Sequence, residues 1–145
     1  MKRFVLAISA IALVSGAALA DPIADRKALM KERGGLVGQL APIAKGEKPF
    51  DAAAVLAALQ GLAANGAKFD VEALFPAGSE TGDTKASPKI WEDMAGFKAA
   101  EAKFEADVAA AIAAAPQDLD AFKAQFGAVA SNCGACHQTY RLPQS

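Results

Sequence analysis

Apolar side chains recur at spacings of three and four residues over most of the chain beyond residue 20. This spacing places them on one face of an α-helix. The alternating runs of β-branched residues that are typical of strands are scarce. The pattern predicts four helices, over about residues 22–44, 51–68, 88–114 and 118–140.

Residues that favour helix starts support these boundaries. Asp21 and Asp51 are good N-caps, and Ser87 followed by Pro88 is a typical first turn. The third helix is expected to run unbroken from this turn to about Ala114. On the first helix, gaps of four and three place seven residues on one shared face: Ile23, Lys27, Met30, Gly34, Val37, Ala41 and Ala44.

The connections between these segments favour a bundle. Those around "GEKPF" and "AAPQ" are short, which is typical of antiparallel neighbouring helices. The stretch "FDVEALFPAGSETGDTKAS", residues 69–87, is rich in turn residues and has little periodicity. Irregular connections of that length are uncommon and often contact a ligand. The expected fold is all-α, an antiparallel four-helix bundle forming one domain over residues 21–145.

The first 20 residues resemble a secretory signal peptide. Lys2 and Arg3 precede a short apolar stretch that ends in Ala18-Leu19-Ala20, a small-residue cleavage site. A transmembrane anchor is the alternative, but the apolar stretch is too short. We therefore expect the mature protein to begin at Asp21, to be exported to the periplasm of a bacterium, and to have no membrane insertion after signal removal.

The net charge of the expected mature protein argues against polyanionic partners. The chain has 15 basic and 16 acidic residues, and setting aside Lys2 and Arg3 leaves 13 basic residues and a net charge of −3 for residues 21–145. A mildly acidic protein is a poor candidate for binding nucleic acid or an anionic membrane surface.

All the chain's Cys and His residues lie together in the motif C-G-A-C-H: Cys133, Cys136 and His137. The apolar stripe of the last helix runs through this motif, so the three side chains are expected to point into the bundle. C-x-x-C-H is the attachment motif of c-type haem. Two thiols one helical turn apart can form thioethers with the two vinyl groups of a porphyrin, and the adjacent imidazole can bind the iron.

Three other interpretations of the motif are weaker. A disulfide between Cys133 and Cys136 would strain a helix and close only a small loop. A thioredoxin-like pair would lie at a helix N-terminus after a strand. A structural zinc site usually needs four Cys or His ligands, and this chain has three such residues.

The chain resembles the cytochrome c prime family, the class II cytochromes c, over essentially its whole mature length. The resemblance is carried by "RKALM", "PIAKGEKPFDAAAV", "FPAGSETGD", "SPKIW" and "CGACHQTYR". It implies one covalent haem c, with iron, attached through Cys133 and Cys136 and bound by His137. It also implies that Arg141 lies close to the proximal side of the haem, that Arg26 approaches a propionate, and that Asp83 belongs to a loop near the haem.

Met30 matches the distal position of the family, where the first helix faces the iron. The resemblance is greatest to the low-spin, six-coordinate branch, in which a methionine there binds the iron as the second axial ligand. Gly34 and Gly35 would let the helix approach the haem. His/Met ligation predicts an electron carrier and not an enzyme, because substrate would have no open iron site.

Two further functions remain open. The first alternative is a five-coordinate cytochrome c prime that binds or sequesters nitric oxide, and the second is a haem-free bundle with a redox disulfide. Redox partner proteins are expected for the electron carrier, which the sequence allows to be a monomer or a homodimer.

Overall fold

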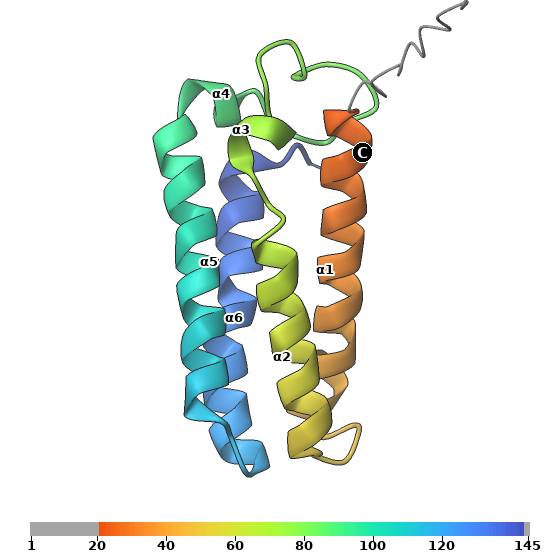
Figure 1. The fold of residues 1–145 in the computed structure, drawn as a ribbon, viewed down its shortest axis with the longest axis vertical. Coiled ribbons are helices and arrows are strands. Elements are labelled where there is room, and N and C mark those ends of the chain that lie inside the picture. Colours follow the sequence, from red (N-terminus) through yellow and green to blue (C-terminus); the bar gives the residue numbers. More distant parts are fainter. Residues whose placement is uncertain (1–20, 144–145) are drawn as a thin grey trace, which may run out of the picture.

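The four long helices stand side by side in the computed structural model, which describes residues 21–143 (Figure 1). They are α1 (Pro22–Ala44), α2 (Ala52–Gly66), α5 (Met94–Ala114) and α6 (Leu119–Tyr140). Consecutive long helices run in opposite directions, and α1 packs against α2 and α6 while α5 packs against the same two helices (Figure 1). The predicted all-α four-helix bundle is confirmed.

Two short helices, α3 (Val71–Leu74) and α4 (Lys89–Glu92), lie in the region between α2 and α5 at one end of the bundle (Figure 1). The sequence pattern predicted neither as a separate element. The rest of the long connection is irregular, as predicted, and it runs over the end of the bundle where α6 finishes.

Aspartate side chains begin the long helices. Asp21 accepts hydrogen bonds from the N–H groups of Ile23 and Ala24, both at 3.0 Å. Asp51 accepts from the Ala54 N–H at 3.0 Å. These bonds satisfy N–H groups that have no partner within the helix. The predicted caps of the first two helices are therefore confirmed.

The prediction of one unbroken third helix was wrong. Asp93 has φ −136° and ψ 55°, which separates α4 from α5, and its carboxylate caps α5 by accepting from the Gly96 N–H at 3.1 Å. The same carboxylate accepts a 2.9 Å hydrogen bond from the Tyr140 hydroxyl of α6. An aspartate that can bond to nearby N–H groups competes with a continuous helix, and here the tertiary bond to Tyr140 favours the break.

Gly96 is required at this junction. A Cβ atom at that position would lie 2.5 Å from the Tyr140 hydroxyl oxygen and the same distance from a carboxylate oxygen of Asp93. The missing side chain therefore permits the bond between α6 and the start of α5.

The buried face of α1 differs from the face that the apolar spacing singles out. Lys27 and Gly34 are exposed, and the buried positions are Arg26, Arg33, Leu40 and Ile43. Periodicity of apolar residues could not show this face, because two of its positions hold arginines that are buried through polar contacts.

Apolar side chains form two clusters along the bundle. The larger one joins all four long helices and includes the fully buried Leu59, Val108 and Phe122. The smaller cluster lies at the end with α3 and α4 and is mostly aromatic: Phe69, Val71, Leu74, Phe75, Ile90, Phe97 and Tyr140. The cavity described below is lined in part by this second cluster.

Within the described residues, no helix is long and apolar enough to cross a membrane. The predicted signal peptide, residues 1–20, lies outside the described residues.

Phe122→Ala should destabilise the protein strongly. Its side chain is fully buried and contacts Phe50 and Phe126, so truncation leaves a cavity and should lower the free energy of unfolding by about 3–5 kcal/mol. Leu142→Ala is the control, because Leu142 is exposed, and it should change the value by less than about 0.5 kcal/mol. Denaturant unfolding of the cofactor-loaded protein measures both. Equal effects of the two variants would contradict this account of the core.

Candidate functional site

A cavity of about 740 Å³ opens between α1, α5, α6 and the loop of residues 83–86. This volume is in the range of small-molecule and cofactor sites. Its walls include the aromatic side chains Phe69, Phe75, Phe97 and Phe104. The cavity is thus a largely apolar site at the end of the bundle that holds α3 and α4.

The last two turns of α6 bring the predicted motif to this cavity. Cys133, Cys136 and His137 all line it. Both cysteines are half-buried free thiols, and His137 is exposed. Burial raises the pKa of the Cys136 thiol to about 11 and also raises the pKa of Cys133. Both side chains are therefore protonated thiols near neutral pH and do not form a reactive thiolate pair.

The imidazole next to them is held neutral. Although His137 is exposed as a whole, partial burial of its ring against the cavity lowers its pKa, and the positive charges of Arg141 and Arg33 lower it further. A neutral imidazole has a free nitrogen lone pair, which is the form that binds a metal. His137 is therefore available as a ligand near neutral pH.

Met30 reaches the same cavity from α1. It is half-buried, lines the cavity, and packs with Cys136 against the aromatic cluster. The structure thus brings the predicted distal methionine to the site that holds the cysteines and the histidine.

Arg26 is a buried cation on the cavity wall, only 4% exposed. Its Nη1 donates to the Leu74 carbonyl at 3.2 Å and the Ser79 hydroxyl at 3.1 Å. Its Nη2 donates to the Ser79 carbonyl and the Thr84 hydroxyl, both at 2.7 Å.

All four of these acceptors are uncharged, and the buried Nε of Arg26 has no acceptor among residues 21–143. The guanidinium group also lies over the Phe75 ring, 4.9 Å from its centroid. Burial lowers the pKa of Arg26. The negative charges of Asp21 and Glu80 act in the opposite direction and raise this pKa, but neither carboxylate is hydrogen-bonded to the guanidinium. A buried guanidinium that bonds to no carboxylate among the described residues is well suited to pair with an anionic group of a ligand in the cavity.

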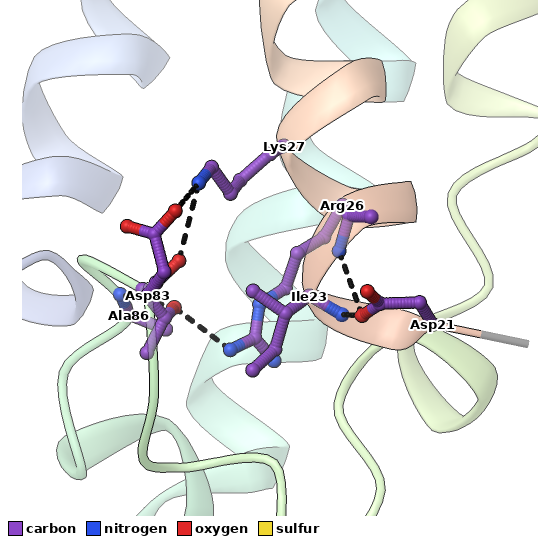
Figure 2. Close-up of polar contacts among 8 residues, drawn as sticks. Asp21, Ile23, Arg26, Lys27, Asp83 and Ala86 are labelled. Carbon is purple, nitrogen blue, oxygen red and sulfur yellow. Dashed lines mark hydrogen bonds and ion pairs between the residues drawn. The ribbon is translucent and has the colours of Figure 1, made fainter.

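Asp83 lies at the mouth of the cavity and pairs with Lys27 (Figure 2). The Lys27 Nζ lies 2.5 Å from a carboxylate oxygen of Asp83 and also donates to its carbonyl at 3.2 Å. The hydrogen bond from Lys27 and the positive charge of Lys27 lower the pKa of Asp83. Arg26 and Lys27, successive residues of α1, therefore both hold the loop that borders the cavity (Figure 2).

Arg141 marks the end of α6 and also lines the cavity. Its N–H bonds to the His137 carbonyl at 3.2 Å, and its backbone forms a bridge to Ala86. Next to it, the Leu142 N–H donates to the Lys85 carbonyl at 2.8 Å. These backbone bonds fix the loop against the helix end, directly after the predicted motif.

Two polar features of the site were missed by the sequence analysis. Tyr140 and Asp93 join α6 to α5, as described above. Arg33 and Glu101 form a buried ion pair on the cavity wall. Arg33 lies seven residues after Arg26 and thus on the same helix face, a signal that the sequence contains.

The residues that line the cavity fit a haem. The aromatic walls suit an apolar macrocycle, the two thiols can reach its vinyl groups, and the neutral imidazole can bind its iron. The Arg26 guanidinium, whose Nε has no hydrogen-bond partner among the described residues, suits a propionate.

Comparison with known proteins agrees with this fit. A family model described as "Cytochrome C'" matches residues 21–141. The chain belongs to the cytochrome c′ family. Its cofactor is one covalently bound haem c, with iron.

Individual members of the cytochrome c′ family are similar over most of the chain. A cytochrome c-556 of Agrobacterium fabrum is 46% identical over 85% of this chain and 82% of its own length. The solved structure of cytochrome c′ from Rhodopseudomonas palustris is 42% identical and covers 87% of this chain and 99% of that one, with a TM-score of 0.80. The nitric oxide complex of a variant of cytochrome c′ from Alcaligenes xylosoxidans is 34% identical, with a TM-score of 0.74, and covers 85% of this chain and 94% of that one.

The bond between Tyr140 and Asp93 should make part of the stability depend on pH. The Tyr140 hydroxyl lowers the pKa of Asp93 from its ordinary value of 3.8. Such a carboxylate stabilises the fold at pH values above 3.8, and this stabilisation is lost as the pH falls through the lowered pKa. Tyr140→Phe should therefore destabilise the protein at pH 7, and the deficit should shrink below about pH 4.

Thermal unfolding of the wild type and Tyr140→Phe at pH 7 and pH 3 tests this expectation. Asp93→Asn, which removes the titrating group, should show a smaller acid-dependent loss than the wild type. A Tyr140→Phe deficit of equal size at both pH values would contradict the assignment.

Proposed function

We propose that this cytochrome is an exported electron carrier in which α6 holds the haem and α1 supplies the second axial ligand. Cys133 and Cys136 form the thioethers and His137 is the proximal ligand of the iron. Met30 is the distal ligand. The observation that carries this proposal is that the Met30 thioether lines the same cavity as His137 but comes from a different helix.

The haem supplies a one-electron ferric/ferrous couple when it is bound. The protein provides a neutral imidazole at His137, since burial and the two arginines lower its pKa. A thioether at Met30 completes the His/Met set that raises haem potentials. If His137 and Met30 both held the iron, the protein would need little rearrangement between the two oxidation states.

The remaining cavity residues orient the cofactor. Arg26 receives a propionate, because its buried charge has only neutral acceptors and its Nε has none. The aromatic walls exclude water from the macrocycle. Arg141 contributes positive charge beside His137 and lowers its pKa.

The contribution of Asp83 to haem binding stays a prediction. Its carboxylate pairs with Lys27 at the cavity mouth. In the proposed arrangement Asp83 therefore acts on the cofactor through the loop that it anchors and not through a direct bond.

Export completes the proposed role. The motif at residues 1–20 is that of a signal peptide, and c-type haem proteins of this family are typically periplasmic. A periplasmic electron carrier exchanges electrons with redox partner proteins, either as a monomer or as a homodimer. A nucleic acid partner does not fit the net charge of −3 given above.

A second function is supported by one of the solved relatives. The cytochrome c′ variant from Alcaligenes xylosoxidans was solved as a nitric oxide complex. In the corresponding function here, His137 alone would hold the iron, Met30 would only fill space, and the open position would bind nitric oxide.

Substitution of Met30 separates the two functions. Met30→Leu keeps the side-chain volume but removes the thioether, so it should convert a low-spin protein that does not bind carbon monoxide into a high-spin protein that does. Met94→Leu is the matched control, because Met94 packs against the same aromatic cluster but does not line the cavity. Visible spectra of the ferrous proteins with and without carbon monoxide measure the change.

The spectra decide between the two axial arrangements. A wild type that already binds carbon monoxide, with a spectrum unchanged in Met30→Leu, would exclude Met30 as a ligand and favour the nitric oxide function. A control variant as reactive as Met30→Leu would show that the effect arises from repacking.

A further inference from the structure

Arg33 and Glu101 form a bidentate ion pair between α1 and α5. The Arg33 Nη1 donates to one carboxylate oxygen of Glu101 at 2.9 Å and its Nη2 donates to the other at 2.6 Å. The third position of the guanidinium fork is also used, since the Nε donates to the Asn65 side-chain carbonyl of α2 at 2.9 Å. Three helices thus meet at this one charged group.

This pair is buried at the haem cavity. The side chains of Arg33 and Glu101 are 9% and 11% exposed, and both residues line the cavity. The Arg33 guanidinium lies 4.9 Å from the Phe69 ring centroid and 4.2 Å from that of Phe104, two of the aromatic walls. The pair is therefore part of the surface that surrounds the cofactor.

Arg33 differs from Arg26 in how its charge is balanced. Arg26 has only neutral acceptors and is free to meet a propionate. Arg33 has its own carboxylate, so its charge is already neutralised by the protein. The two buried arginines of α1 thus have different roles at the same site.

Stability alone does not explain a buried pair. Removing two charges from water is costly, and apolar residues of similar size are often as stabilising or more so. The position of the pair suggests an electrostatic role. Arg33 and Glu101 line the same cavity as Cys133, Cys136 and His137, so both charges lie beside the space that the cofactor would occupy.

We propose that Glu101 is a potential-setting residue, whose carboxylate neutralises Arg33 on the wall of the haem cavity and thereby prevents that cation from raising the haem reduction potential. Ferric haem carries one more positive charge than ferrous haem. An uncompensated guanidinium in a poorly hydrated site therefore disfavours the ferric state. The argument needs only the haem and holds for either axial arrangement proposed above.

Reversible redox titration of the holoprotein measures the effect of Glu101 on the haem reduction potential directly. One electron passes from a redox mediator to the ferric iron, and no bond is made or broken. Glu101→Gln leaves Arg33 charged, because arginine does not lose its proton in proteins. It should raise the ferrous-to-ferric ratio at a fixed ambient potential about tenfold, which is a shift of about 59 mV for a one-electron couple.

Two further variants separate charge from structure. Glu105→Gln removes the same charge one helical turn along α5, where Glu105 is exposed, and solvent screening should leave the ratio within about twofold of the wild type. The double variant Arg33→Met/Glu101→Gln removes both charges and should return most of the way to the wild-type ratio. Visible spectra of all variants must show unchanged axial ligation for the comparison to hold.

Three results would overturn the proposal. The first is a ferrous-to-ferric ratio in Glu101→Gln that equals the ratio in Glu105→Gln, and the second is a double variant whose ratio is raised as far as that of Glu101→Gln. The third is a change of the ratio that occurs only together with a change of axial ligand. If Glu101→Gln does not accumulate as holoprotein, Arg33→Met tests the same pair in the opposite direction, because it removes the cation and leaves the Glu101 carboxylate. It should lower the ratio, and an unchanged or raised ratio would contradict the role of the pair.

Discussion

The burial of two arginine side chains on one face of α1 is the constraint on which the haem-binding end of the bundle depends. Arg26 binds the loop after α3 through the Leu74, Ser79 and Thr84 oxygens. Arg33 joins α1 to α2 and α5 through Asn65 and Glu101. A buried guanidinium must satisfy its donors, so these contacts fix α1 relative to both neighbours and to the loop. The cavity lies among the elements that they connect.

The other end of the bundle is held by ordinary apolar packing. Its cluster includes fully buried residues of three helices, Leu59 of α2, Val108 of α5 and Phe122 of α6, and of its buried members only Phe104 also lines the cavity. The two ends of the bundle therefore differ in what they contain. One end holds the larger apolar cluster. At the other end, thiols, an imidazole, a thioether and the two arginines of α1 line one cavity.

The parts of this arrangement that could be predicted from the sequence are those with local signals. The aspartate caps of α1 and α2 and most of the extent of the long helices each depend on residues a few positions apart, and they were predicted correctly. The break at Asp93 was not, because it depends on Tyr140, 47 positions away. The buried face of α1 could not be predicted, because arginine normally indicates solvent and only tertiary partners show that Arg26 and Arg33 are inside. The roles assigned to Met30, His137 and the cysteines agree with their place on the cavity wall and stay predictions.

The central claim is that Cys133 and Cys136 tether one haem to α6. The most direct test is the intact mass of the chain produced in a host that exports and matures c-type cytochromes, recorded after acid denaturation. The account predicts a mass equal to residues 21–145 plus one haem, and loss of that addition in a variant with both cysteines replaced by alanine. A wild-type chain that releases its haem on denaturation and runs at the bare polypeptide mass would contradict it.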